Sequence, residues 1–209
     1  MLAACNNNSE CETITTVDSL KREIIIRDST IQALITRSGM NSGLQYDSIL
    51  AAAKKIAVHL KEKQFDNVST YADPAGQLSF SPSAYIDSGA KAFATGTIAG
   101  LWNDQAIYHW GMAEGSGDSI LLTFKNYYSK YIYNRDFANA PTIEFNAIRR
   151  GNTTATTNFD SVYPSSGHVD FYFPNTSSDK FDWNTLRLIF INKGGQWYLR
   201  HILHEGYSI

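Results

Sequence analysis

The clearest alternation of apolar and polar positions lies near the C-terminal end of the chain, between Leu186 and His204. Two strand-like runs there flank Gly194-Gly195, and adjacent glycines favour a two-residue hairpin turn because each adopts positive φ without a Cβ clash. Residues directly opposite each other in a hairpin lie on the same face of the sheet. Counting back from the turn predicts a core face made of the pairs Asn192/Trp197, Phe190/Leu199, Leu188/His201 and Leu186/Leu203.

The opposite face of this hairpin mixes apolar and charged side chains, which is typical of a sheet surface that meets water or a partner. The same count places on it Arg187, Ile189, Ile191, Tyr198, Arg200 and Ile202, followed by His204. A sheet with one strongly apolar face needs helices to cover that face, and only the first half of the chain offers long helical patterns.

The first helical pattern has apolar residues on the a and d positions of a heptad repeat, interrupted by Arg27, and predicts a helix over residues 17–38. Its stripe consists of Val17, Leu20, Ile24, Ile31 and Leu34. A polar linker, 38–43, separates it from a second helix that begins near Asp47 and runs through Lys63. A lone helix with this stripe would expose it. The first helix is therefore either a self-associating stalk or a helix docked on its own domain.

The chain accordingly divides into three parts. Residues 1–16 are predicted to be a polar, disordered tether, 17–38 an amphipathic helix, and 44–209 one folded domain. His109 and Trp110 alternate along a strand, so only one of them faces inward, and we expect it to be Trp110. Strand-like runs within the domain cover 105–123, 142–148, 158–163 and 169–173.

Composition limits the classes of function. The net charge of -2 provides no basic field for nucleic acid. The glycine-rich turns match no phosphate-binding pattern, so no nucleotide or other cofactor is expected. Aromatic residues make up 13% of the chain, and aromatic clefts are common ligand surfaces as well as common cores.

Both cysteines, Cys5 and Cys11, lie in the polar N-terminal segment. Leu2-Ala-Ala-Cys5 resembles the lipobox of bacterial lipoproteins, in which the cysteine becomes the lipidated first residue. The charged and apolar regions that precede a lipobox are not in this sequence, and a chance match is the alternative. The resemblance implies lipidation of Cys5, a location at the bacterial cell envelope, and membrane contact through the lipid anchor only.

Helices followed by an antiparallel sheet that ends in a long hairpin, with a tryptophan after its turn, resemble the NTF2-like superfamily. Within it, about residues 46–209 resemble a group of secreted or lipid-anchored bacterial proteins. The motifs that carry this resemblance are His109-Trp-Gly with Gly115-Ser-Gly-Asp118, Asp182-Trp183 before Leu186-Arg-Leu-Ile-Phe190, and Trp197-Tyr-Leu with His204.

The resemblance implies an α+β fold: an NTF2-like cone, in which N-terminal helices cover a bent antiparallel sheet, preceded by a helical tether. In that superfamily the cone holds small ligands or catalytic residues, and the outer sheet face often forms dimers. No particular activity follows, because fold alone does not decide function.

His201 is the main candidate among ionisable residues, because the hairpin register places it on the concave face. Its imidazole needs partners, and Tyr127, Tyr128 and Asp118 are the candidates. With Trp110 these residues form the predicted ligand site. His201 is either a satisfied core histidine or a pocket acid or base. No metal site is predicted, because residues 201 and 204 point to opposite faces of a strand.

Three classes of function remain. The first is a non-catalytic module that binds a small molecule or glycan in the cone; the second is an assembly module; the third is an enzyme with His201 as general base. A filled cone favours assembly, and an open pocket around His201 favours a ligand. We also expect a homodimer, held by the stalk or by the outer face of the terminal hairpin.

Overall fold

The computed structural model describes residues 8–113, 116–151, 153, 155–176 and 182–206, and in the first helix it describes side chains only at 19–31, 43 and from 45 onward. The chain forms two compact units, Met1–Asp47 and Ser48–Ile209. The helices are α1 (Asn8–Lys61), α2 (Phe65–Ser69), η1 (Thr95–Asn103), α3 (Phe124–Tyr127), η2 (Tyr128–Ile132), η3 (Phe137–Asn139) and α4 (Phe159–Val162). The strands are β1 (Gln77–Ser81), β2 (Lys91–Ala94), β3 (Ile107–Met112), β4 (Ser119–Thr123), β5 (Thr142–Phe145), β6 (Gly167–Phe173), β7 (Asn184–Lys193) and β8 (Gln196–Gly206).

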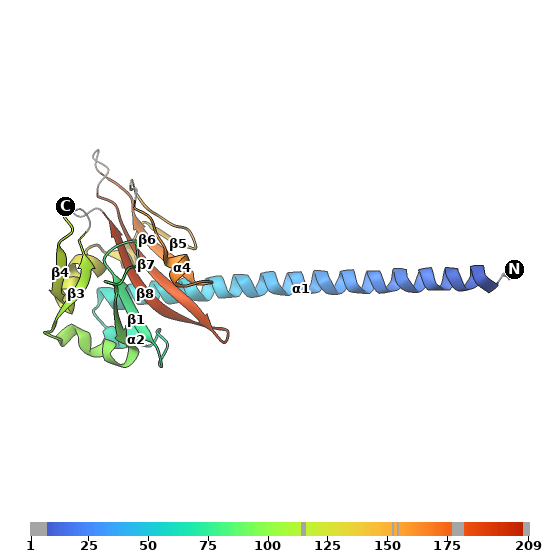
Figure 1. The fold of residues 1–209 in the computed structure, drawn as a ribbon, viewed down its shortest axis with the longest axis horizontal. Coiled ribbons are helices and arrows are strands. Elements are labelled where there is room, and N and C mark those ends of the chain that lie inside the picture. The colour runs from blue at the N-terminus through green and yellow to red at the C-terminus, as the bar shows by residue number, and fades with distance from the viewer. Residues whose placement is uncertain (1–7, 114–115, 152, 154, 177–181, 207–209) are drawn as a thin grey trace. The chain divides into compact units, whose positions relative to one another are not determined.

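Helix α1 differs from the two helices expected from the sequence. It begins at Asn8 and continues to Lys61, so it includes the predicted linker 38–43 and part of the predicted tether (Figure 1). Glycine in a helix costs roughly 1 kcal/mol relative to alanine. That cost weakens a helix without ending it, because good helix-forming residues lie on both sides of the linker.

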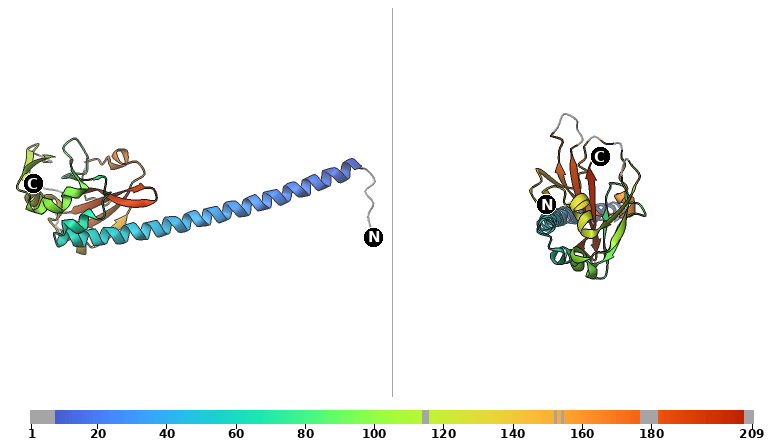
Figure 2. Two further views of the ribbon diagram at one scale, coloured as in Figure 1. Left: turned by 90° about the horizontal axis from the view of Figure 1, so that it is seen from below. Right: turned by 90° about the vertical axis from the view of Figure 1, so that its left-hand side faces the viewer.

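The fold of the second unit is α+β, as predicted. Six strands form a bent and twisted sheet in the order β2-β1-β8-β7-β6-β5, while β3 and β4 form a separate hairpin (Figures 1 and 2). Only the β1–β8 pairing is parallel among the neighbouring strands of these sheets. The long β7–β8 hairpin turns at Gly194-Gly195, where both glycines have positive φ as the sequence predicted.

A β-bulge in β8 corrects the predicted register of this hairpin. The pairs Asn192/Trp197 and Phe190/Leu199 form as expected, but the next pair is Ile189/His201, which leaves Arg200 without a cross-strand partner. One extra residue shifts every later side chain to the other face. His201 and Leu203 therefore lie on the outer face, and Ile202 and His204 lie on the core face.

The core lies between the concave face of the sheet and the helices. Helical residues from Ile49 to Leu60 join α2, α3, η2 and the β3–β4 hairpin in covering that face. Trp110, Phe171, Phe190 and Leu199 are buried as predicted, whereas Trp197 is half-buried. The expectation that Trp110 faces inward and His109 outward is also confirmed.

The outer face of the sheet is covered by the connection between β5 and β6. This connection, residues 146–166, contains the short helix α4 where the sequence predicted a strand over 158–163. Phe159 of α4 packs with Ile86, Ile189 and Leu203 in a second hydrophobic cluster. Asn158 fastens the connection to a preceding loop, because its side chain accepts from the Ile86 amide and donates to the Ile86 carbonyl.

Candidate functional site

Three of the five predicted ligand-site residues, Trp110, Tyr127 and Tyr128, lie in the hydrophobic core. Trp110 and Tyr127 are fully buried and stacked, with ring centroids 3.8 Å apart and an interplanar angle of 9°. The Tyr128 hydroxyl donates to the Leu60 carbonyl at 2.6 Å, and the Trp110 Nε1 donates to the Leu122 carbonyl at 2.9 Å. Burial raises the pKa of Tyr127 well above its ordinary value. These rings fill the cone.

Two predicted members lie elsewhere. Asp118 is exposed in the turn between β3 and β4, where its carbonyl accepts from the Ala113 amide. His201 lies on the outer face of the sheet because of the bulge. The structure therefore does not bring His201, Asp118 and the aromatic residues together.

His201 is a buried histidine with both ring nitrogens satisfied. Nδ1 is hydrogen-bonded to the Tyr163 hydroxyl at 3.0 Å, and Nε2 to the Ser81 hydroxyl at 2.8 Å. Desolvation by burial lowers the pKa of His201 to about 3. Its surroundings match the satisfied core histidine of the two sequence-based alternatives.

A small cavity of about 30 Å³ lies on the concave side beside the ends of β7 and β8. It is lined by Pro82, Met112, Ala113, Ile120, Lys130, Tyr131, Asn134, Asn184, His204 and Gly206. The Asn184 Oδ1 accepts from Asn134 Nδ2 at 2.9 Å and lies 3.1 Å from His204 Nε2. Because this oxygen cannot donate, the proton of His204 is on Nε2, and Nδ1 is an acceptor. Burial lowers the pKa of His204 to about 4.

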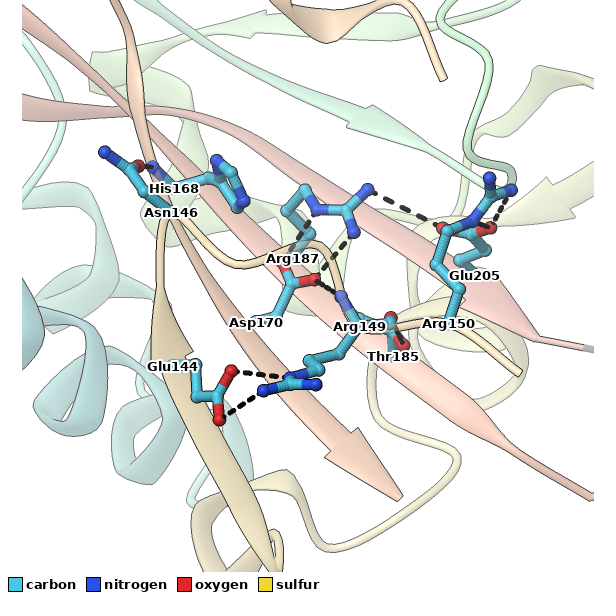
Figure 3. Close-up of polar contacts among 9 residues, drawn as sticks. All are labelled: Glu144, Asn146, Arg149, Arg150, His168, Asp170, Thr185, Arg187 and Glu205. Carbon is cyan, nitrogen blue, oxygen red and sulfur yellow. Dashed lines mark hydrogen bonds and ion pairs between the residues drawn. The ribbon is translucent and has the colours of Figure 1, made fainter. Parts of the chain in front are cut away.

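A buried cluster of charged side chains lies on the opposite, outer face (Figure 3). Arg187 and Asp170 are completely buried and form two hydrogen bonds, from Nε at 2.7 Å and from Nη2 at 2.6 Å. Glu205 lies 3.6 Å from Arg187 Nη1 and pairs closely with Arg150. The cluster reaches its exposed edge at Arg149, which forms an ion pair with Glu144.

The charges in this cluster balance, since three arginines face three carboxylates. Burial raises the pKa of Glu205, against the opposing effect of its two arginine neighbours. Burial also lowers the pKa of His168, whose ring packs on Phe159. Arg187 also contacts Phe159, with its guanidinium carbon 5.2 Å from the centroid of that ring.

The cluster attaches the β5–β6 connection to the sheet. The Arg149 amide donates to Asp170 at 2.8 Å, and the Thr185 hydroxyl donates to the Arg149 carbonyl at 2.6 Å (Figure 3). The attraction within the buried ion pair, together with these additional hydrogen bonds, offsets the cost of removing the charges from water. The same bonds hold the connection in one position on the sheet. The sequence placed Arg187 on this face but predicted that the face meets water or a partner, whereas the β5–β6 connection of the same chain covers it. One signal in the sequence could have indicated this cluster. Arg187 and Ile189 are two positions apart in one strand-like run, and His168 and Asp170 are two positions apart in another, so each pair lies on one face of its strand.

The described residues contain no group of three or more histidine, cysteine or acidic side chains arranged to hold a metal ion. Among these residues, no helix combines the length and apolarity that crossing a membrane requires. Cys5, the predicted lipidation site, lies outside the described residues.

Comparisons with known proteins found similarity to solved structures only. No protein-family model matches the chain, and the search of curated proteins found no match. One similar structure is described as a calcium/calmodulin dependent protein kinase II association domain from Xanthomonas campestris, with a TM-score of 0.33 and 10% identity over 76% of this chain and 85% of that chain. Another, a protein labelled Rd1NTF2_05 that carries five substitutions, has a TM-score of 0.32 and 9% identity over 77% of this chain and 98% of that chain.

Proposed function

We propose that this chain is a non-catalytic assembly module that self-associates through helix α1. The observation that carries the proposal is the state of that helix. Every side chain described from Ser19 to Ile31 is exposed, including Leu20, Ile24 and Ile31 of the heptad stripe. Helices in proteins gain most of their stability by packing an apolar face against a neighbour. The heptad stripe is therefore expected to pack against a second helix.

The energy available from such packing is of the same order as the cost of association. Each large apolar side chain that becomes fully buried contributes roughly 1.5–3 kcal/mol. The three described stripe residues on each of two helices together contribute roughly 9–18 kcal/mol, which compares with an association cost of about 4–15 kcal/mol. The filled cone also supports assembly, because it leaves little interior volume for a ligand.

The outer sheet face is a weaker basis for a dimer than the sequence suggested. Ile189 and Ile202, two of the four apolar residues assigned to that surface, are buried within the chain. Ile189 packs beneath α4, and the bulge turns Ile202 into the core. The remaining two, Ile191 and Tyr198, are half-buried, so the helix stripe is the larger exposed apolar surface of the two.

Paired substitutions on the full chain test the proposal. Leu20→Lys/Ile24→Lys places charges on the seam, while Ile25→Lys/Ile26→Lys places the same charges on helix positions outside it, at side chains that are 68% and 63% exposed. Light scattering should give a dimer mass for the original chain and the control, and a monomer mass for the seam variant. A monomeric original chain, or a seam variant that remains dimeric, contradicts the proposal.

Binding of a small molecule in the cone is the second candidate function. The observation in its favour is the cavity that His204 lines together with Asn184 and Tyr131, beside the hydrogen bond between His204 Nε2 and Asn184 Oδ1. Its volume suits a group of one or two water-sized atoms rather than a sugar ring. Nuclear magnetic resonance of the His204 ring during titration with ethanol tests this candidate, and an unchanged ring signal would argue against it.

The proposed location is the bacterial envelope, with the chain held by a lipid on Cys5. The support is the Leu2-Ala-Ala-Cys5 sequence followed by polar residues. Mass spectrometry of the protein from its native membrane should show a diacylglyceryl group on Cys5. An unmodified cysteine in that preparation would remove this part of the proposal.

A further inference from the structure

An open groove of about 640 Å³ runs along β2 and the helix η1 that follows it. Its lining includes the apolar side chains of Phe93 and Leu101, which are almost completely buried. All four residues of β2 line it, together with Gly96, Thr97, Gly100, Leu101, Asp104 and Tyr108. The volume lies in the range of small-molecule sites, about 300–1000 Å³.

Two opposite charges line this groove without forming an ion pair with each other. The Lys91 ammonium lies 5.1 Å from the Tyr108 ring centroid and 5.8 Å from that of Phe93. The Asp104 carboxylate accepts from the Tyr108 hydroxyl at 2.5 Å and from the Ala106 amide at 2.8 Å. Neither charge has an ion-pair partner in the described part of the chain.

Asp104 is held in its ionised form. The hydrogen bond from Tyr108 and that from the Ala106 amide lower the pKa of its carboxyl group, and the Tyr108 contact is the larger cause. Each carboxylate oxygen accepts one of these bonds and keeps a further lone pair. The Lys91 ammonium lies near the faces of the Tyr108 and Phe93 rings, which attract a cation.

We propose that this groove binds a zwitterionic amino acid with an apolar side chain. The ligand carboxylate pairs with Lys91, its ammonium group pairs with Asp104, and its side chain lies on Phe93 and Leu101. A ligand with only one charge would leave one of the two protein charges without a partner. The groove therefore distinguishes the zwitterion from its singly charged analogues, as specificity requires a difference between competing ligands.

Two glycines, Gly96 and Gly100, are part of the groove lining. A Cβ atom built at Gly96 or Gly100 meets no other atom within 4 Å, and neither residue has a left-handed backbone. Larger side chains at these positions enter free space, so they obstruct the groove without displacing the core. Ala99 on the same helix is exposed and lies outside the groove lining, which makes it a matched control position.

Calorimetric titrations of the full chain with L-phenylalanine, 3-phenylpropionate and phenethylamine test the proposal. The last two compounds lack the ammonium and the carboxylate, respectively. L-phenylalanine should bind more tightly than either analogue, and Gly100→Leu should abolish its binding while Ala99→Leu leaves it unchanged. Each exposed charge pair should change affinity by about two- to fivefold.

Two charge variants assign the ends of the ligand. Lys91→Met should weaken the binding of L-phenylalanine and 3-phenylpropionate and leave the affinity for phenethylamine unchanged. Asp104→Asn should weaken the binding of L-phenylalanine and phenethylamine and leave the affinity for 3-phenylpropionate unchanged. The proposal is overturned if L-phenylalanine does not bind the original chain at millimolar concentration, if Gly100→Leu still binds it, or if both charge variants affect all three compounds equally.

Discussion

At the level of single residues, the outer face depends on buried charges that keep their partners. Arg187 and Asp170 both have fully inaccessible side chains, whereas Arg149 and Glu144 form a similar two-bond pair with side chains that are 47% and 34% exposed. Removal of one member of a buried pair leaves the other charge in a medium that solvates it poorly. The same removal at the surface leaves a charge that water solvates.

Arg187→Met should therefore lower the free energy of unfolding by about 3–5 kcal/mol. Arg149→Met should lower it by less than about 1 kcal/mol. Urea denaturation followed by tryptophan fluorescence measures both. Equal losses in the two variants would show that the buried pair does not stabilise the cover over this face.

The buried histidines make stability depend on pH. The pKa of His201 is about 3 and that of His204 about 4 in the folded chain, against about 6.5 in an unfolded one. The unfolded state therefore binds protons first as pH falls below about 6.5, and stability decreases. The carboxyl groups with lowered pKa, such as Asp104, act only at lower pH.

Each of these histidines should reduce the free energy of unfolding by up to about 1.4 kcal/mol per pH unit below pH 6. Denaturation at pH 7, 6 and 5 measures the slope. His201→Gln should make that slope shallower by the contribution of one proton, even if the variant is less stable at pH 7. An unchanged slope would mean that His201 is protonated in the folded chain.

At the level of elements, one inserted residue in β8 determines which side chains enter the core. Arg200 takes no part in the β7–β8 pairing, and its guanidinium donates to the Gln77 carbonyl at 2.7 Å. The extra residue places His201 between Ser81 and Tyr163 and turns Ile202 into the core.

Deletion of Arg200 should prevent cooperative folding. The shifted register would send Ile202 and His204 outward and bring His201 and Leu203 into the cone. Arg200→Ala keeps the chain length and removes only the side-chain contacts of Arg200, which are hydrogen bonds to Gln77 and Ser79 and a contact with the Tyr163 ring. It should cost only about 1–2 kcal/mol. Near-ultraviolet circular dichroism during thermal unfolding compares the two. A sharp transition in the deletion variant, equal to that of Arg200→Ala, would contradict this role of the bulge.

At the level of the whole molecule, the unfolding of Met1–Asp47 should depend on protein concentration, whereas the unfolding of Ser48–Ile209 should not. The four tryptophans are Trp102, Trp110, Trp183 and Trp197, and all of them lie in Ser48–Ile209. Tryptophan fluorescence therefore reports only that unit, whereas far-ultraviolet circular dichroism also reports the helix of Met1–Asp47. Self-association makes the stability of a helix depend on protein concentration.

A tenfold increase in protein concentration should raise the midpoint of helix loss by several degrees and leave the fluorescence midpoint unchanged. Parallel thermal scans by the two methods measure this difference. The Leu20→Lys/Ile24→Lys variant should show no concentration dependence by either method. Fluorescence and dichroism midpoints that rise together would instead locate the self-association in Ser48–Ile209.

The sequence by itself determined the elements whose signals are local. Alternation around Gly194-Gly195 predicted the terminal hairpin and its first pairs, because a two-glycine turn sets the register next to it. Helical spacing before the strands predicted the covering helices, and together they predicted the α+β class. Trp110 in the core followed from the large apolar area that a tryptophan buries.

Only the tertiary structure decided which surfaces are buried and which residues meet. Nothing in the local pattern marks Arg200 as the residue that has no partner in β7. The predicted register was therefore wrong for every residue after Arg200, and so was the prediction that His201 lies in the cone. The mixed face that carries Arg187 was predicted to meet water or a partner, yet Arg187 is buried there because Asp170 and Glu205, distant in the sequence, offset the cost of burying its charge. The groove beside Lys91 and Asp104 likewise depends on the packing of η1 against β2, which brings two opposite charges to one surface without pairing them.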